Sequence, residues 1–220
     1  MKKTAAILVL MLILISLSAG SFYVGTDGGV GFNSIISGKN YKGYSYGSAS
    51  AYYLSVPVIY EFNEWTGIES AVVLSGRNYT LERYYQRSTV EDLRMNNVFV
   101  EVPILARFRT SAYDGLALFA SVGGFLGYWA WGQQKGDAMG LAMTETTPVD
   151  QETELDRRNR FQAGVEASVG CTIDFSRLRV QFCCRYALTL TDLNLPHEKG
   201  GYPLHNSTFT VGCALMWRCF

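Results

Sequence analysis

The chain has few of the residues on which most enzyme and metal sites depend. It contains only two histidines, His197 and His205, and its five cysteines lack the CxxC spacing of a metal site. Basic and acidic residues number 19 each, so no basic excess indicates nucleic acid as a partner. Proline is scarce too, with five residues against 22 glycines. We therefore expect no catalytic, cofactor-binding or metal-binding residues, and no cofactor.

The first twenty residues form a separate segment. Lys2 and Lys3 precede the apolar run Ala5–Leu17, and Ser18-Ala19-Gly20 is a small-residue cleavage site. This order is typical of a secretory signal peptide. A membrane anchor is the alternative, but the run is shorter than the roughly 20 residues that span a bilayer. No cysteine follows as in a lipoprotein. We predict a cleaved signal peptide at 1–20 and an outer-membrane β-barrel domain at 21–220, with 17 basic and 19 acidic residues.

Beyond the signal, apolar and polar residues alternate with the period of β-strands. Residues 160–175 place Phe161, Val165, Val169 and other apolar side chains on one face, and Arg160, Glu166 and Asp174 on the other. A typical strand is only about 5–6 residues long, so alternation over this length predicts a deep apolar environment. Similar segments at 22–34, 51–62, 66–79, 97–109, 116–131, 177–192 and 208–220 give eight strands in all.

The links between these strands alternate in length. Residues 63–65, 110–115 and 176–177 are short links, whereas 36–49, 80–95, 133–158 and 192–206 are long. Short turns at one end and long loops at the other are typical of outer-membrane barrels, which have periplasmic turns and extracellular loops. We predict an all-β, eight-stranded antiparallel up-and-down transmembrane β-barrel in the outer membrane of a diderm bacterium, with both termini periplasmic.

One segment has a helical alternative. Gly115–Gly132 is eighteen residues without a charge, which could be a membrane helix. It contains five glycines, however, and each interior glycine weakens a helix by about 1 kcal/mol. A lone helix would also leave the remaining strands in lipid with open edges, which bilayers do not tolerate.

The polar faces carry charges of both signs. In a soluble, lipocalin-like barrel these would face water, whereas in a membrane barrel they would fill the lumen and pair there. The lumen could be an electrostatic core or line a path for water or solutes. The charged residues are Glu61, Glu69, Arg77, Glu101, Arg107, Arg109, Arg160, Glu166, Asp174, Arg179, Arg185 and Arg218.

Other side chains have expected places in this barrel. Tyr60, Phe62, Tyr128, Trp129, Trp131 and Trp217 lie near strand ends, as in an interfacial aromatic girdle. Pro57 and Pro103 each lack a ladder N–H, so we expect bulges there. The cysteines (Cys171, Cys183, Cys184, Cys213 and Cys219) are expected to serve as small apolar strand residues, with a disulfide among them as the alternative.

Two strands carry a family resemblance. "YLSVPVIYEF" and "VFVEVPILARF" share the pattern x-V-P-[VI]-[IL]-x-x-F, and the second resembles a strand of the PorT-like outer-membrane β-barrel family, also labelled porin family. "TGIESAVVLSGRNY" and "CRYALTLTDL" resemble neighbouring strands of that family, although Ala187 and Thr189 stand near its usual glycines. The resemblance, which extends to small OmpA-, OmpX- and OmpW-like barrels, implies fold and location and little about function.

An enzymatic function is a distant alternative. His205-Asn206-Ser207 resembles the His–Ser pair of outer-membrane lipid A deacylases, which also need an acid. No Asp or Glu follows Ser207, so Glu198 would have to serve from the preceding loop. We therefore predict that the protein is not an enzyme. The acidic segment 144–158 could bind a cation weakly, but a solvated loop is favoured.

The predicted role is structural, or surface interaction through exposed loops. A narrow porin or transport channel for small solutes or small apolar molecules is the alternative. Expected partners are outer-membrane lipids, barrel-assembly machinery, and an extracellular or host ligand; the loop at 38–53, rich in Tyr, Ser and Gly, suits such contacts. The terminal aromatic strand resembles the signal that assembly machinery recognises. Its alternation places Arg218 and Phe220 in the lumen phase, unless a bulge intervenes.

Overall fold

A computed structural model describes residues 20–37, 44–85, 88–110, 113–138, 141–147, 160–193 and 203–220. The described side chains exclude residues 44, 83–91 and 137–147. The strands are β1 (Ser21–Ser37), β2 (Tyr44–Glu61), β3 (Thr66–Tyr85), β4 (Ser88–Arg109), β5 (Leu116–Ala138), β6 (Leu141–Thr147), β7 (Phe161–Phe175), β8 (Leu178–Thr189) and β9 (Leu204–Arg218).

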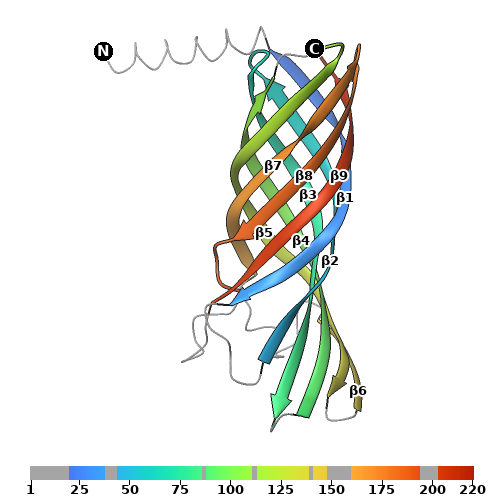
Figure 1. Cartoon of the computed structure of the whole chain (residues 1–220), viewed down its shortest axis with the longest axis vertical. Helices are drawn as coiled ribbons and strands as arrows, with labels where there is room; N and C mark the ends of the chain where they lie inside the picture. The colour runs from blue at the N-terminus through green and yellow to red at the C-terminus, as the bar shows by residue number, and fades with distance from the viewer. Residues whose placement is uncertain are drawn as a thin grey trace, which may run out of the picture.

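Eight of these strands close into a barrel (Figure 1). The strand order is β4-β3-β2-β1-β9-β8-β7-β5, and β4 also pairs with β5, which completes the circle. Every pairing is antiparallel, including that of β1 with β9. Closure removes the sheet edges that a bilayer would not tolerate. The predicted eight-stranded barrel is confirmed.

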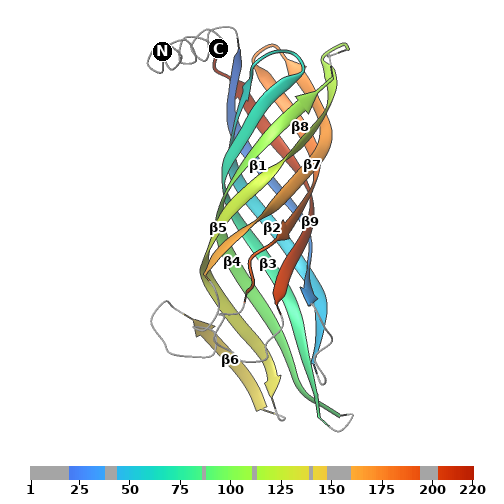
Figure 2. The ribbon, with the colours of Figure 1, turned by 90° about the vertical axis from the view of Figure 1, so that its left-hand side faces the viewer.

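The long links differ from the expected loops. β3 and β4 continue their ladder through the predicted loop at 80–95, with pairs such as Thr80↔Arg94. β5 likewise runs on to Ala138 and turns back as β6, a ninth strand outside the barrel circle. The extensions of β2 to β5, together with β6, project as a curved sheet beyond the end that carries the long links (Figure 2). Tyr, Thr and Leu in "NYTLERYY" favour strand over loop, which explains this difference.

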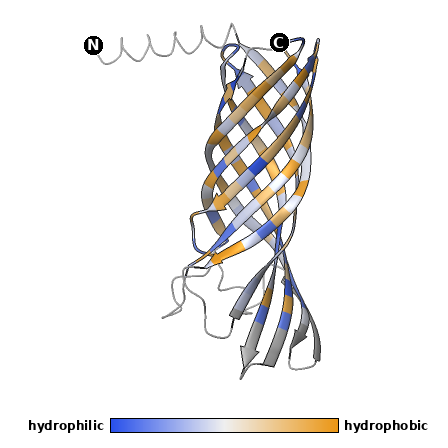
Figure 3. Cartoon of the chain, viewed as in Figure 1, coloured by the Kyte–Doolittle hydropathy of each residue, from blue (hydrophilic) through white to orange (hydrophobic). Residues whose placement is uncertain are grey.

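The barrel wall is apolar outside and polar inside. Val30, Val72 and Leu126 on the outer wall are 61–70% exposed, whereas Arg179 on the inside has no exposed surface. Figure 3 shows hydrophobic and hydrophilic residues alternating along the ribbons of the barrel strands. This arrangement is the reverse of a soluble barrel, so the lipocalin-like alternative is excluded.

The segment for which a membrane helix was the alternative is a strand, β5. Residues 116–138 form a strand that pairs with β4 and with β7, so Gly115–Gly132 is not a membrane helix. No helix in the described ranges is long and apolar enough to cross a membrane.

The aromatic girdle is confirmed only in part. Phe62, Tyr128, Trp131 and Trp217 are 37–53% exposed on the outer wall, as expected. Trp129 instead points inward and is 7% exposed, because it lies next to Tyr128 and adjacent strand residues face opposite sides. A register shift opposite Val98 and Phe99 makes Ala130 an extra residue and turns Trp131 outward again.

The bulges expected at Pro57 and Pro103 are absent. The register of β2 with both β1 and β3 is unchanged across Pro57, and that of β4 with both neighbours is unchanged across Pro103. Instead, backbone pairing is interrupted beside each proline: between β1 and β2 at Pro57, and between β3 and β4 at Pro103. Ser70 Oγ donates a hydrogen bond of 2.8 Å to the Pro103 carbonyl, so the sheet compensates without a slip.

The last residue lies outside the lumen, which corrects the expected phase. β9 ends at Arg218, which is exposed. Beyond the end of the strand, successive side chains need not point to opposite faces of the wall. The Cys219 amide donates to the Phe22 carbonyl at 2.8 Å, and the Phe22 amide donates to the Phe220 carbonyl at 3.1 Å. The Phe220 ring is 64% exposed and stacks on Phe22, with ring centroids 5.4 Å apart.

Candidate functional site: the charged lumen

The lumen is filled by charged side chains, and all of those given next except Asp27 are among the lumen residues that the sequence predicts. Each of the following is at most 7% exposed: Asp27, Glu61, Glu69, Arg77, Glu101, Arg107, Glu166, Arg179 and Arg185. Burying an unpaired charge is very costly, so such groups persist only with partners. The contacts below show that each of these charges has one.

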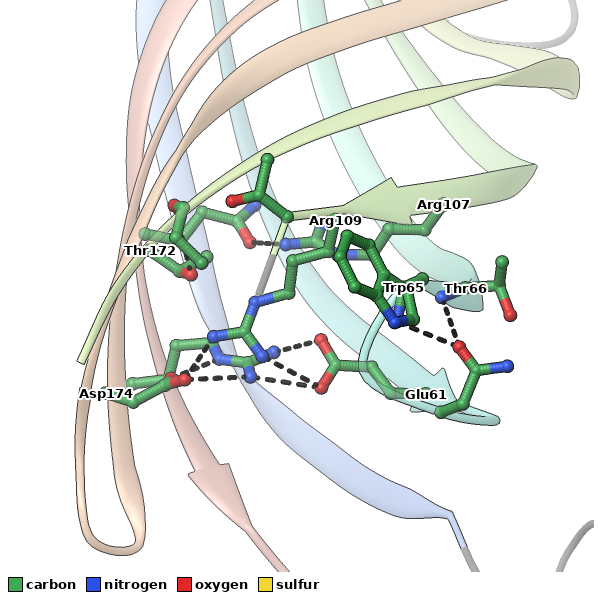
Figure 4. Close-up of polar contacts among 12 residues, drawn as sticks. Glu61, Trp65, Thr66, Arg107, Arg109, Thr172 and Asp174 are labelled. Carbon is green, nitrogen blue, oxygen red and sulfur yellow. Dashed lines mark hydrogen bonds and ion pairs between the residues drawn. The ribbon is translucent and has the colours of Figure 1, made fainter. Parts of the chain in front are cut away.

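The first cluster lies near the end of the barrel that carries the short turns (Figure 4). Arg179 donates from Nη1 and Nη2 to the two Glu61 oxygens, at 2.6 and 3.1 Å. Its Nε donates to Asp174 Oδ1 at 2.6 Å. Arg109 also bonds to Asp174 and lies 3.5 Å from Glu61. Two arginines and two carboxylates from β2, β4, β7 and β8 thus close this end.

The turn beside this cluster is held by Asn63. Its Oδ1 accepts hydrogen bonds from the backbone amides of Trp65 and Thr66, at 2.8 and 2.9 Å. This capping of a short turn fixes the end of β2, from which Glu61 enters the lumen. Trp65 itself is 56% exposed at the rim.

A second group is centred on Arg107. Its Nη1 donates to Glu69 Oε2 at 2.7 Å, and its Nη2 donates to Gln181 Oε1 at 2.8 Å. Ser121 Oγ donates to the same Glu69 oxygen at 3.1 Å. Because Gln181 lies on β8 and Arg107 on β4, this group bridges two strands that are not neighbours in the sheet.

A third group is centred on Arg185. Its Nη2 lies 3.1 Å from Asp27 Oδ2, and its Nε lies 3.2 Å from Glu166 Oε1. The Tyr53 hydroxyl donates to the other Asp27 oxygen at 2.9 Å. Asp27 therefore has a bond to each carboxylate oxygen, from β2 and from β8.

A fourth group contains Arg77. Its Nη2 lies 2.6 Å from Glu101, and its Nη1 donates to Thr189 Oγ1 at 3.2 Å. Beyond it, a layer of amides crosses the lumen. Asn33 Nδ2 donates to Asn206 Oδ1 at 3.0 Å and to the Asn78 carbonyl at 3.2 Å. Because of these contacts, the lumen is also packed with side chains on the side of Arg77 that faces the long links.

Aromatic rings lie beneath four of these arginines. Arg179 lies over the Tyr23 ring at 3.8 Å, and the other three rings also contact glycines. Arg107 lies over the Phe119 ring at 3.8 Å, Arg77 over Phe125 at 5.0 Å, and Arg185 over Tyr53 at 4.5 Å. Each of these three rings lies against glycine in a neighbouring strand; the glycines are Gly170, Gly164, and the pair Gly29 and Gly212. Glycine is needed there because a Cβ would lie 2.5–2.8 Å from the ring at Gly29, Gly164 and Gly170, and 2.0 Å from the Tyr53 hydroxyl at Gly212. The cation–π contacts add to the ion pairs.

Sequence reasoning missed these rings. Phe119, Phe125 and Trp129 are apolar, so the period-two pattern alone suggests the lipid face, and β5 alternates weakly for that reason. One sequence feature does indicate their position. Residues 116, 118, 122, 126 and 128 already form an apolar face, so the odd-numbered residues, which include Ala117 and Ser121 as well as these rings, belong to the opposite, lumen-facing side of the strand.

The space left in the lumen is small. A cavity of about 20 Å³ lies among Tyr53, Ser75, Arg77 and Glu101, which is room for a single water molecule. The side chains thus fill an eight-stranded barrel as expected for its size. The geometry is that of an electrostatic core.

The His–Ser pair does not form a catalytic arrangement in the described part of the chain. His205 Nδ1 lies 3.2 Å from the Thr191 carbonyl, and Ser207 Oγ bonds to the Tyr186 hydroxyl at 2.9 Å. The neighbouring Asp192 accepts from the Leu204 amide. His197 and Glu198 lie outside the described residues.

Other expected sites are placed as follows. The described ranges hold no group of three or more His, Cys, Asp or Glu suited to a metal ion. Three predicted segments lie partly or almost wholly outside those ranges: residues 148–158 of the acidic segment 144–158, residues 38–43 of the loop at 38–53, and residues 1–19 of the signal. All five cysteines are free thiols, and four of them lie on β7, β8 and β9.

The chain is similar to some solved structures. No curated protein matches the chain. Among solved structures, it is similar to Neisserial surface protein A, with 13% identity and a TM-score of 0.42 over 89% of this chain and 97% of that one. It is also similar to the attachment invasion locus protein Ail of Yersinia pestis, with 12% identity and a TM-score of 0.41 over 89% and 98%. OprG from Pseudomonas aeruginosa matches with 11% identity and a TM-score of 0.47 over 90% and 96%.

The family assignment rests on a sequence match. A family model described as "Outer membrane protein beta-barrel domain" matches residues 16–194, which is most of the chain. The closed barrel with its apolar outer wall and charged interior is the structure that such a match requires. The chain therefore belongs to the outer membrane protein β-barrel domain family and is an integral protein of the outer membrane.

Proposed function

We propose that this protein is a sealed structural barrel that acts at the cell surface through the end with the long links. The observation that carries this proposal is the set of contacts across the lumen. Arg77 on β3 bonds to Thr189 on β8, and Arg179 on β8 bonds to Glu61 on β2. These bonds join strands that are far apart around the circle, so they cross the space that a channel would need.

The projecting sheet supports a surface role. The extensions of β2 to β5, with β6, present backbone and side chains beyond the barrel wall (Figure 2). With the termini and short turns on the periplasmic side, this sheet lies outside the cell. A protease added to intact cells would then cut in the long links, and a tag after Phe220 would be reached only after the outer membrane is permeabilised. A tag that is accessible on intact cells would reverse the orientation.

Planar-bilayer recording tests the sealed lumen. The refolded barrel should give no stepwise current, because the cavity beside the Arg77–Glu101 pair has room for only a single water molecule. As a positive control, replacing Arg77, Arg107 and Arg185 by serine would remove three of the cross-lumen bridges and should produce measurable steps. Regular current steps from the unmodified protein would establish the narrow-channel alternative instead.

We propose that the protein has no catalytic activity. The support is that His205 and Ser207 have separate hydrogen-bond partners. Lipid A from cells with the native protein and with the Ser207→Ala variant should give the same mass pattern. A lost acyl chain that returns on Ser207→Ala would show a deacylase.

Export and assembly complete the proposal. Mass analysis of the protein purified from outer membranes should start at Ser21, after removal of residues 1–20. Deleting Phe220 should lower the amount of folded barrel, because the terminal strand is the expected contact for barrel-assembly machinery. Unchanged folding of that deletion in cells would remove Phe220 from the signal.

A further inference from the structure

Two cations lie directly opposite each other on the outward face of the projecting sheet. Arg94 on β4 and Lys135 on β5 are register partners, and both side chains are exposed. We call these two residues the rim cations. Like charges opposite each other across a strand pair are destabilising, so an anion between them would stabilise the pair. Within the described ranges, neither rim cation forms an ion pair.

The rim cations share a face with the lipid-facing wall of the barrel. Trp131, a member of the outer aromatic girdle, has Val98 as its register partner, and the register is unbroken from this pair to the rim cations. Because side chains alternate along a strand, both pairs point outward. With a rise of about 3.4 Å per residue and a tilt of about 45°, the rim cations lie roughly 10 Å beyond the girdle along the membrane normal. Long Arg and Lys side chains reach back over such a distance, so their charges lie among the lipid headgroups.

The neighbouring rows on this face are neutral toward the membrane and acidic away from it. Asn96 and Gln133 are register partners between the girdle and the rim cations. Asp92 on β4 and Glu82 on β3 are register partners in the next row beyond the rim cations. An anion that approaches from the membrane therefore meets amide donors and two cations before it meets a carboxylate.

The Arg94 guanidinium is weakly held in its present position. It leans across β3, away from Lys135, and its Nη2 lies 3.4 Å from Ser50 Oγ on β2. A normal N–H···O hydrogen bond is about 2.7–3.2 Å long, and the same Ser50 oxygen also accepts from Asn78 Nδ2 at 3.3 Å. The guanidinium can thus turn toward Lys135 at little cost. Its fork of N–H donors matches the oxygens of a phosphate group.

We infer that Arg94 and Lys135 bind the phosphate monoester of an outer-leaflet lipid headgroup, which lies between the two cations. A phosphate monoester carries a charge of about −1.5 to −2 near neutral pH, which two cations balance. The inference rests on the proposed function, because the end with the long links must face the cell exterior for the rim cations to meet the outer leaflet. The bound lipid anchors the projecting sheet to the membrane surface.

NMR of the ¹⁵N-labelled barrel in lipid nanodiscs tests the site, because lipid surrounds both rims there regardless of the orientation in cells. The Arg94 Nε–H and Trp131 indole resonances are followed as phosphatidic acid replaces phosphatidylcholine. Both resonances should shift together and saturate. Phosphatidylglycerol, a diester with a single negative charge, should give a midpoint at a higher fraction of anionic lipid. Sodium phosphate added to phosphatidylcholine nanodiscs should give no saturable shift, which separates a lipid headgroup from free phosphate.

Charge variants separate this site from general attraction of anionic lipid. Arg94→Gln/Lys135→Gln should raise the phosphatidic acid midpoint, followed at Trp131, about tenfold, because both charge-assisted contacts are lost. Arg94→Lys/Lys135→Arg keeps both charges and should retain saturable binding. Arg177→Gln/Arg218→Gln is the matched control, since it removes two exposed and adjacent arginines at the opposite rim and should leave the Trp131 midpoint unchanged. A heat-modifiable gel band confirms folding of each variant.

Three outcomes would overturn the site. They are no saturable shift with phosphatidic acid, an equal loss of affinity in Arg94→Gln/Lys135→Gln and in Arg177→Gln/Arg218→Gln, or the same shifts from sodium phosphate in phosphatidylcholine nanodiscs. Those outcomes leave the bilayer recording and the tag after Phe220 unaffected. A tag that is accessible on intact cells would instead refute the outer leaflet as the source of the lipid, without altering the titration.

Discussion

The ring of Tyr53 lies against Gly29 and Gly212 while its hydroxyl donates a 2.9 Å hydrogen bond to Asp27. Gly29 and Gly212 are register partners at the junction of the first and last strands. Tyr53 therefore packs across the place where the barrel closes, and Arg185 lies over its ring. A single side chain of β2 thus contacts both of the strands that close the barrel and both members of the Asp27–Arg185 ion pair.

Replacing Tyr53 by phenylalanine should weaken the barrel without opening it. The ring stays over the two glycines, but Asp27 loses a hydrogen bond to a charged group, worth about 1.5–3 kcal/mol. Urea unfolding in lipid vesicles, followed by tryptophan fluorescence, measures the change. Tyr113→Phe, at a residue that is 81% exposed, serves as the control, with a change of less than about 0.5 kcal/mol. Equal effects of the two variants would contradict the role of the Asp27 bond.

Adding even a methyl group at Gly212, in the closing junction, should destabilise the barrel. In Gly212→Ala the new Cβ would lie 2.0 Å from the Tyr53 hydroxyl and 2.8 Å from the Gly28 carbonyl, so Tyr53 or the junction must move. We expect a loss of about 1–3 kcal/mol, as for overpacking. Gly28→Ala is the matched control, since its Cβ meets nothing closer than 3.4 Å. A stable Gly212→Ala barrel with unchanged unfolding would show that Tyr53 does not occupy this place.

The Arg77–Glu101 pair should show strong coupling. Arg77→Met leaves the Glu101 carboxylate buried and unpaired, which should cost about 3–5 kcal/mol of unfolding free energy. The double variant Arg77→Met/Glu101→Leu should recover most of that loss, because no charge remains buried. Arg218→Met, at an exposed site, is the control. Additive effects of the two single changes in a double-mutant cycle would show that the residues do not interact.

The turn between β7 and β8 offers a stabilising change. Ser176 has φ of 54°, a left-handed conformation that costs a residue with a Cβ about 1–2 kcal/mol. Ser176→Gly removes this cost but adds backbone freedom to the unfolded chain, so we expect a net gain of about 0.5–1 kcal/mol. The unfolding midpoint in urea reports the gain, and Ser176→Ala should show none. A Ser176→Gly barrel that is no more stable than Ser176→Ala would argue against the strained turn.

The outer wall of this protein is predictable from sequence, and its interior partners are not. Strict alternation from Arg160 to Asp174 predicts both β7 and its two faces, because one face must meet lipid along its whole length. The partner of Arg179 could not be derived in that way. Which carboxylate meets it depends on the stagger between β8 and β2, which short-range patterns do not encode.

The wrong expectations share a physical cause. Hydrophobicity alone places Trp129 on the outer face, although it follows Tyr128 in the strand; for Phe220, whose face the sequence leaves open, the end of β9 at Arg218 cancels the phase. Pro57 and Pro103 were expected to break register, yet the sheet leaves pairs open beside them instead. The extension of β3 and β4 is not predictable from alternation, because beyond the barrel wall neither face of these strands must be apolar and their polar sequence is like that of a loop.

The distribution of the interior charges has a consequence for how the barrel is completed. Asp27 and Glu61 belong to the first two strands, and their cationic partners Arg185 and Arg179 both lie on β8. Asp27 thus lacks its cationic partner until β8 is made, and until then the cationic partner available to Glu61 is Arg109 on β4, which lies 3.5 Å away in the finished barrel. A closure offset by one residue would turn one set of charges toward lipid, so the correct stagger is the one in which opposite signs meet. Charge complementarity between the two ends of the chain thereby favours the correct stagger when the barrel closes.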